Sequence, residues 1–293
     1  MSNLSLYLAS VLIWGSTWIA ITFQYGVVAA EVSVAYRFWL AGALLMAWCA
    51  VRGEALRFTL REHGWLALQG ALMFGFNYVW VYLAEQRIPS GLVATLFSLM
   101  VFLNLIGARI AFGTPIPGKA LVGAALGVVG VAFICLPGAG TALGPGLGGG
   151  VTLALLGTLS ASFSNLLSQR NQRHGLPVLQ GNAYGMLYGA ALVTLYCLVL
   201  GRPFAFDPSL RYLGSLAFLA VFGSVLAFGA YLTLIGRIGA GRAGYTMVAT
   251  PLVALLISTV VEGLRWQPTL ALGVALCLGG NLLVLRPAKV KAA

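Results

Sequence analysis

Apolar stretches of about 20 residues recur along the whole chain and are separated only by short polar breaks. A helix of that length, rising about 1.5 Å per residue, crosses the roughly 30 Å hydrocarbon core of a bilayer. Hydrophobic residues make up 60% of the chain and charged residues 8%, whereas soluble domains have roughly 25% charged residues. A soluble fold cannot hide that much apolar surface, so we predict an all-α integral membrane protein.

Ten membrane-spanning segments result when the sequence is divided at its charged, proline and glycine clusters. They cover residues 6–23, 34–51, 64–83, 90–112, 119–136, 149–168, 178–200, 210–234, 240–261 and 269–285. The first segment lacks the basic leader of a signal peptide and exceeds the usual apolar length of about 7–15 residues. We therefore expect it to be a membrane span.

Lysine and arginine are distributed unequally over the breaks between these spans. If the N-terminus is cytoplasmic, twelve of the seventeen basic residues lie on the cytoplasmic side and five on the other. Because cytoplasmic loops carry the excess of Lys and Arg, this distribution predicts that both termini are cytoplasmic. The same rule accounts for the net charge of +11, so we expect a lipid bilayer as partner and no nucleic acid.

The two halves of the chain resemble one another in sequence. A shift of 150 positions aligns Gly123 with Gly273 and Gly130 with Gly280, and a shift of 148 aligns Ala35-Tyr36 with Ala183-Tyr184. Five spans per half is an odd number, so the second half must enter the membrane from the opposite side.

The sequence therefore predicts two inverted five-helix repeats. The first comprises residues 1–137 and the second residues 151–293, and an uncharged, glycine-rich linker at 138–150 joins them. Secondary transporters recurrently use inverted repeats, and they bind substrate near the membrane midplane where the repeats meet. This organisation indicates a carrier, acting as a monomer or homodimer.

Residues typical of catalysis and ion coupling are absent from the middle of the spans. All six acidic residues lie in loops or at span ends, both histidines lie in loops, and the four cysteines have no metal-ligand spacing. We therefore predict no enzymatic activity, no metal and no cofactor. Cation pumps and many proton-coupled carriers retain a buried carboxylate, so the missing acid predicts a substrate with little net charge.

Neutral polar and aromatic residues recur at helical spacing within several spans. Trp14 and Trp18 are four residues apart, as are Tyr78 and Tyr82, so each pair shares a helix face. The predicted substrate-binding residues are Trp14, Ser16, Trp18, Asn77, Tyr78, Tyr82, Ser164, Asn165, Tyr245, Thr246 and Thr250. Alternatively, the hydroxyls bond within or between helices and the aromatic residues form interfacial belts. Convergence of several such groups well inside their spans favours a common cavity for a small molecule.

Two prolines and one arginine are further residues to which the sequence assigns a role. Pro89, at the start of the fourth span, and Pro251, within the ninth, interrupt backbone hydrogen bonding and are predicted hinges. Arg37 is the only basic residue clearly within a span. We expect its side chain to reach the outer headgroups, with contact to a substrate carboxylate as the alternative.

Glycines recur along the fifth and tenth spans, which predicts close approach of these two helices. They are Gly123, Gly127 and Gly130 in the fifth span and Gly273, Gly279 and Gly280 in the tenth.

Several short motifs occur in the order found in one known superfamily. They include Trp14-Gly-Ser16 in the first span, Arg37-Phe38 with Ala41 in the second, and the twinned fourth/fifth and ninth/tenth spans. Over nearly its whole length the chain resembles the drug/metabolite transporter superfamily, in particular its EamA-type ten-helix exporters. One departure is that Glu262-Gly263 reverses the Gly-Glu step with which the ninth helix typically ends, and that Phe112-Gly113 lacks the acid in the fourth.

The resemblance implies alternating-access export of metabolites, often amino acids, across a bacterial inner membrane. A neutral, aromatic cavity is most similar to that of the YddG-type amino-acid exporters. The predicted function is therefore export of small neutral or zwitterionic metabolites, with aromatic or apolar amino acids favoured. The alternatives are efflux of drugs or lipophilic cations and, in a different class, a membrane-embedded enzyme or scaffold.

Overall fold

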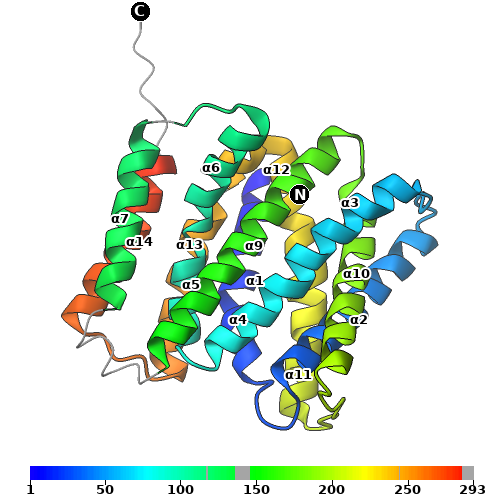
Figure 1. Cartoon of the computed structure of the whole chain (residues 1–293), viewed down its shortest axis with the longest axis horizontal. Helices are drawn as coiled ribbons and strands as arrows, with labels where there is room; N and C mark the ends of the chain where they lie inside the picture. Colours follow the sequence, from blue (N-terminus) through cyan, green and yellow to red (C-terminus); the bar gives the residue numbers. More distant parts are fainter. Residues whose placement is uncertain (117, 136–145, 244, 286–293) are drawn as a thin grey trace, which may run out of the picture.

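The computed structural model describes residues 1–116, 118–135, 146–243 and 245–285, and within these ranges every regular element is a helix (Figure 1). The first half of the chain forms α1 (Asn3–Thr22), α2 (Ala30–Val51), α3 (Leu60–Gly70), η1 (Ala71–Phe76), α4 (Asn77–Glu85), α5 (Ser90–Phe97), α6 (Met100–Phe112) and α7 (Gly118–Ile134). The second half forms α9 (Leu147–Arg173), α10 (Val178–Val199), α11 (Leu210–Phe218), η2 (Leu219–Leu226), α12 (Ala227–Ala243), α13 (Tyr245–Val261) and α14 (Pro268–Leu285).

Each of the ten predicted stretches coincides with a helix or with a run of consecutive helices. By length and composition, seven of these helical stretches are long and apolar enough to cross a membrane, and three apolar helices are shorter. The all-helical prediction is therefore confirmed for the described residues. The count of ten spans and the cytoplasmic side of the termini stay predictions, and most of the predicted linker lies outside the described residues.

Side-chain caps set several of the helix starts. Thr59 accepts a hydrogen bond from the Glu62 backbone N–H, and the Glu62 carboxylate accepts one from the Thr59 N–H. This capping box satisfies two backbone donors that the first turn of a helix leaves unpaired. As a result, α3 begins at Leu60, four residues before the predicted start of the third span.

Two membrane-crossing runs contain a π-helical segment in their middle, which the sequence patterns did not predict. These segments are η1 and η2, and their starts lie 148 positions apart, as do Gly75 and Gly223 within them. Wider π turns often mark functional sites in helices. η1 contributes to the cavity described below, and η2 packs against α1, α2 and α12.

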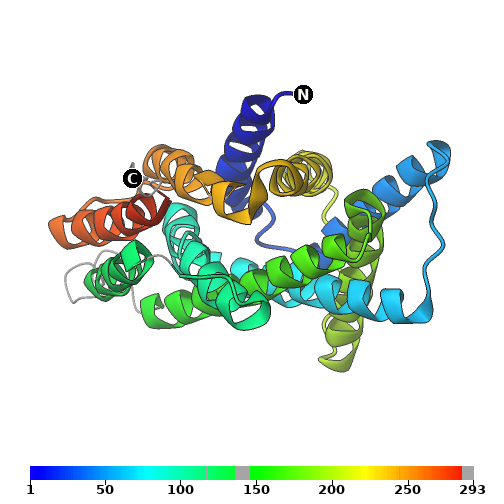
Figure 2. The same ribbon diagram turned by 90° about the horizontal axis from the view of Figure 1, so that it is seen from above.

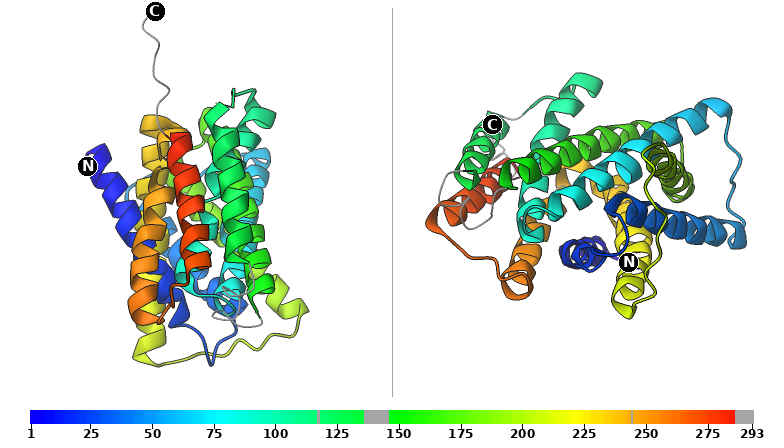
Figure 3. Two further views of the ribbon diagram at one scale, coloured as in Figure 1. Left: turned by 90° about the vertical axis from the view of Figure 1, so that its left-hand side faces the viewer. Right: turned by 60° about the horizontal axis from the view of Figure 1, so that its bottom comes forward.

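The helices form two facing rows, best seen from above (Figure 2). One row contains α1, α12 and α13, and the other contains α4, α5, α6 and α9. The pair α7 and α14 closes one end of the molecule, and α2, α3 and α10 close the other (Figures 2 and 3). The core of the protein thus lies between two layers of helices.

Many contacts between the two halves of the chain occur in corresponding pairs. α1 packs against α12 and α13, while α9, the first helix of the second half, packs against α4, α5 and α6. α2 packs on α10, α5 on α13 and α7 on α14. The contacts of α1 with α12 and α13 therefore have counterparts, in which the two halves exchange places, in those of α9 with α4, α5 and α6.

Glycines allow α7 and α14 to touch backbone to backbone. A Cβ atom at Gly130 would lie 2.6 Å from the Gly273 carbonyl oxygen, and one at Gly280 would lie 2.5 Å from that of Gly123. Both distances are shorter than Cβ atoms tolerate, so only glycine fits. The predicted close approach is confirmed for these four glycines, whereas Gly279 has open space at its Cβ position.

Replacement of Gly273 by alanine is expected to destabilise the protein. The added methyl group would lie 2.7 Å from the Gly130 carbonyl oxygen, and overpacking of this kind costs about 1–3 kcal/mol. Gly279→Ala on the same helix is the matched control, because it meets no neighbour and improves helix propensity. Thermal unfolding of the purified protein measures both. Equal melting temperatures for the two variants would contradict the proposed contact.

Candidate functional site

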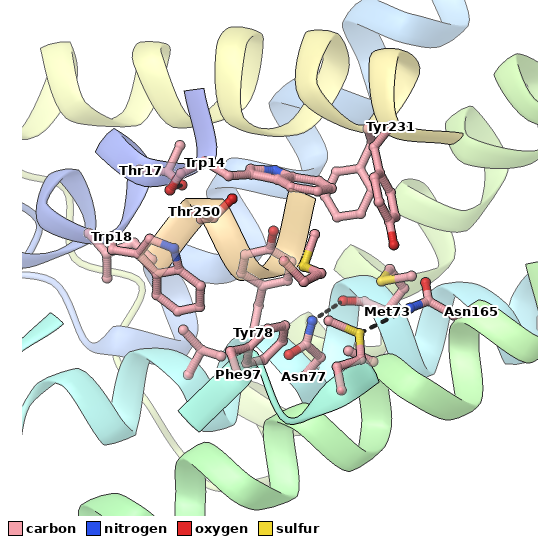
Figure 4. Close-up of a pocket in the computed structure, with 16 residues that line it drawn as sticks. Trp14, Thr17, Trp18, Met73, Asn77, Tyr78, Phe97, Asn165, Tyr231 and Thr250 are labelled. Atoms are coloured by element: carbon pink, nitrogen blue, oxygen red, sulfur yellow. Dashed lines mark hydrogen bonds between the residues drawn. The ribbon is translucent and has the colours of Figure 1, made fainter. Parts of the chain in front are cut away.

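A cavity lies between the two rows of helices, at the level of the π-helical segment η1 (Figure 4). It is lined by Trp14, Thr17, Trp18, Ile21, Met73, Asn77, Tyr78, Val81, Phe97, Met100, Ala161, Asn165, Phe228, Tyr231, Met247 and Thr250. These residues come from both halves of the chain. The cavity volume is about 60 Å³, in a measure by which one water needs about 10–15 Å³, so it has room for a handful of waters.

An aromatic cluster forms one wall of the cavity. The Trp14 ring lies edge-on to Phe228 and Tyr231, with centroid distances of 5.1 and 4.9 Å. Its indole N–H donates to the Gly223 carbonyl oxygen at 3.1 Å. Edge-to-face pairs add about 0.5–1.5 kcal/mol beyond simple burial, so Trp14 on α1 is held firmly against α12 and η2.

Polar groups are distributed sparsely among these apolar walls. The Asn77 amide donates to the Met73 carbonyl oxygen at 3.1 Å, and the Asn165 amide donates to the Met100 sulfur at 3.0 Å (Figure 4). Within the described residues, the Asn77 side-chain oxygen and the Trp18 indole N–H have no hydrogen-bond partner. A buried polar atom without a partner costs about 1–3 kcal/mol. Two such atoms therefore belong to residues that line the cavity.

Six of the predicted substrate-binding residues line the cavity together: Trp14, Trp18, Asn77, Tyr78, Asn165 and Thr250. Four others, namely Ser16, Tyr82, Ser164 and Thr246, are not among the lining residues. The side chain of Tyr245 lies outside the described part of the structure.

Two of the predicted residues away from the cavity, Ser16 and Ser164, donate hydrogen bonds to backbone oxygens elsewhere. Ser16 donates to carbonyl oxygens of its own helix, and Ser164 donates to the Gln69 carbonyl oxygen on α3. Ser160, one turn before Ser164, likewise donates to the Leu72 carbonyl oxygen. Ser160 and Ser164 therefore join α9 to η1 and α3. Thr246 is fully buried beside Thr250, which donates to its carbonyl oxygen.

Sequence reasoning missed much of the apolar lining. The residues concerned include Met73, Phe97, Met100, Phe228, Tyr231 and Met247. One usable signal was present, because Phe228 and Tyr231 are three residues apart and therefore share a face of the eighth span. The methionines gave no signal, since a single apolar residue in a membrane helix can face lipid, a neighbouring helix or a cavity.

Arg37 lies inside the protein, so the expectation that it reaches the headgroups is wrong. Its side chain is only 1% exposed. The Nε atom donates to the Ser224 hydroxyl at 3.0 Å, and an Nη atom donates to the Tyr82 hydroxyl at 3.4 Å. The guanidinium also lies 4.5 Å from the centre of the Tyr78 ring. Hydrogen bonds inside the bundle have thus replaced the headgroup contact that snorkelling would supply.

Near Arg37, a set of hydrogen bonds joins the segment that follows α1 to the end of α4. Tyr82 donates to the Gln24 side-chain oxygen at 2.8 Å. Tyr25 donates to the Tyr82 carbonyl oxygen at 3.1 Å and faces the Glu85 carboxylate at 3.4 Å. Burial, together with the nearby Glu85 charge, raises the pKa of the Tyr25 phenol well above its ordinary value. Tyr25 therefore keeps its proton at neutral pH and acts as a donor.

The same end of the molecule carries a contact between the two halves. The Glu262 carboxylate accepts hydrogen bonds from the Ser90 backbone N–H, at 3.1 and 3.2 Å, and from its hydroxyl at 2.6 Å. The reversed acidic step at Glu262 thus caps the first residue of α5. Pro89, one of the predicted hinges, immediately precedes this contact, and the other, Pro251, lies within α13.

Comparison with known proteins agrees with this architecture. A model of the EamA-like transporter family matches residues 1–136 and again residues 148–286. The chain belongs to this family. Membership places it in the drug/metabolite transporter superfamily, whose helix pattern its sequence resembles.

Individual relatives cover most of the chain. It is 31% identical to an uncharacterized inner membrane transporter of Escherichia coli strain K12, YedA, over 91% of this chain and 85% of the relative. An uncharacterized transporter of Bacillus subtilis, YyaM, is 24% identical over 89% of this chain and 87% of the relative. A solved crystal structure shares the fold, with a TM-score of 0.69, 22% identity and 96% coverage of both chains.

The family and the apolar helices together identify a multi-pass transporter of the inner membrane. The predicted class and location are therefore confirmed. Large apolar residues such as Leu12, Val199 and Val260 are exposed on the helix surfaces, as expected where a protein faces lipid.

Replacement of Glu262 by glutamine is expected to weaken the contact between the halves. Hydrogen bonds to a charged group contribute about 1.5–3 kcal/mol, and the neutral amide accepts more weakly from Ser90. Arg265→Gln is the control, because this substitution removes one charge from a nearby exposed residue. Melting temperatures of the purified proteins report the effect, and an unchanged value for Glu262→Gln would show that the contact contributes no stability.

Proposed function

We propose that this transporter exports small neutral or zwitterionic metabolites, with aromatic or apolar amino acids as the preferred substrates. The observation that carries the proposal is the cavity itself. Its walls are aromatic and apolar, its few polar groups are neutral, and both halves of the chain contribute to it. An amino acid with a large apolar side chain offers the matching chemistry.

In this proposal the substrate side chain lies against Trp14, Trp18 and Tyr78. Its polar end meets Asn77, Asn165 and Thr250, which line the same cavity. The two atoms without partners, on Trp18 and Asn77, support this arrangement because a substrate could supply their hydrogen bonds. The substrate chemistry is the one for which the YddG-type exporters are known.

The size of the cavity requires the walls to move on binding. Three of the lining residues are methionines, Met73, Met100 and Met247. Methionine side chains are unbranched and adapt to irregular shapes, so they can make room for a solute larger than a few waters. The break in helical structure between α5 and α6, at Ser98 and Leu99, is beside Phe97 and Met100 and gives this wall a further point of adjustment.

We further propose that transport occurs by alternating access between two inverted repeats with cytoplasmic termini. The exchange of contacts between the halves supports this, because a symmetric interface has two equivalent ways to rock around a central site. In that mechanism the bonds of Glu262 to Ser90 must break when the cavity opens toward their end of the protein.

Efflux of lipophilic cations is the second candidate function, and the structure disfavours it. Carriers of cations use a membrane carboxylate, and none of the six carboxylates, all of which are described, lines the cavity. An enzyme or scaffold is the remaining candidate.

Replacement of Trp14 or Tyr78 by alanine is expected to reduce amino-acid export at least about tenfold, because each removes a large apolar contact in the cavity. Release of radiolabelled phenylalanine from loaded proteoliposomes measures the rate. Trp48→Ala is the control, because Trp48 is an exposed tryptophan outside the cavity. Wild-type transport rates in both cavity variants, with intact folding, would contradict the assignment of this substrate site.

Cells expressing the protein are expected to gain no resistance to cationic dyes, since no carboxylate lines the cavity. Growth in graded ethidium, compared with an empty vector, measures this. Resistance would favour cation efflux, whereas absence of solute counterflow in the purified protein would favour an enzyme or scaffold.

A further inference from the structure

Arg37 is a buried positive charge that forms no salt bridge with any carboxylate of the described residues. Its side chain is 1% exposed, and none of the six carboxylates, all within the described residues, lies within 4 Å of it. The carboxylate of Glu85, one turn beyond Tyr82 on α4, is bonded to Tyr25 instead. Arginine stays protonated in proteins, so the charge cannot be lost by titration.

The Arg37 guanidinium lies directly behind the wall of the cavity. It covers the ring of Tyr78, a lining residue, at 4.5 Å. On its other side, a Cβ atom at Gly223 would lie 3.1 Å from Arg37 Nη2 and 2.7 Å from the methyl group of Thr17. Thr17 also lines the cavity. One layer of side chains therefore separates the charge from a bound solute.

A structural role alone does not account for a charge at this place. Arg37 donates to two neutral hydroxyls, on Ser224 and Tyr82, and its guanidinium lies over the aromatic rings of its neighbours Phe38 and Tyr78. A neutral donor such as glutamine could serve those hydroxyls without the desolvation cost of a buried cation. An ionisable group retained inside a membrane bundle indicates a functional partner of opposite charge.

We infer that Arg37 makes the cavity selective for solutes that carry a carboxylate. The surrounding medium is apolar, so the field of the guanidinium reaches across the Tyr78 and Thr17 layer with little screening. A solute whose carboxylate is turned toward this wall is stabilised. Its ammonium group then faces Asn77 and Thr250, and its apolar side chain stays against Trp14 and Trp18 and reaches only the near edge of Tyr78. This inference rests on the proposed transport of amino acids and assigns the recognition of their carboxylate to Arg37.

Ser224 offers a matched pair of variants that change the charge without removing Arg37. Ser224→Ala deletes the hydroxyl that accepts from Arg37 Nε and leaves the positive charge in place. Ser224→Asp places a carboxylate at the same position and neutralises the charge locally. Because the new carboxylate would be paired with Arg37, this variant should fold even if Arg37→Gln does not.

The experiment compares ligands that differ only in the carboxylate. Calorimetric titration of the purified protein measures binding of phenylalanine against phenylalaninol, and of 3-phenylpropionate against 3-phenylpropanol. We expect the wild type and Ser224→Ala to prefer each acid over its alcohol about tenfold or more. In Arg37→Gln and Ser224→Asp the preference should fall to within about threefold of unity, while the neutral 3-phenylpropanol binds as before.

The outcomes separate this inference from the proposed function. If the wild type binds phenylalanine and phenylalaninol equally, or if Arg37→Gln weakens acids and alcohols alike, Arg37 is structural and the inference is overturned. If neither amino compound binds but 3-phenylpropionate is preferred over its alcohol, amino-acid transport fails and the selectivity stands. Binding of none of the four ligands would overturn both.

Discussion

Lipid offers no hydrogen bonds, and this single constraint determines most of the architecture. Each backbone N–H and C=O group within the hydrocarbon core must find its partner inside the protein. Helices satisfy that demand locally, which is why every regular element in the described ranges is a helix. Departures from regular helix are then tolerated only in the interior. The π-helical segments η1 and η2, and the break between α5 and α6, fall beside the central region for this reason.

The same constraint explains how the helices hold together. Lipid tails are as apolar as leucine, so burial of apolar surface adds little to helix association, and close backbone contact and interhelical hydrogen bonds contribute instead. Gly130 against Gly273 illustrates the first, and Ser164 donating to Gln69 illustrates the second. Because these contacts lie at the two ends of the molecule and along α9, the middle remains available for a cavity.

Polar groups near the cavity differ in kind from those that join helices. Ser160 and Ser164 of α9 each donate to a neighbouring backbone, whereas Asn77 and Trp18 each keep one buried atom without a partner. Arg37 adds a charge without a counter-charge within 4 Å. An unpaired buried polar group lowers stability. The unpaired atoms of Asn77 and Trp18 line the cavity, where a passing solute can supply their hydrogen bonds and leave again. Glu262 and Ser90 join the two halves of the chain. The sequence repeat does not reproduce this contact, because Phe112 stands where a shift of 150 positions would place the acid.

The sequence by itself determined the membrane environment, the helical class, the approximate place of each helix and six residues of the cavity. Those properties depend on local patterns, namely the length of apolar runs and the spacing of side chains along one helix. Tertiary structure alone decided that Ser164 faces a neighbouring backbone while Asn165 faces the cavity. It also decided that Arg37 turns inward to Ser224, 187 positions away in the sequence. The physical reason is that a side chain's partner in lipid is chosen by which helices meet, and helical periodicity carries no information about the neighbour.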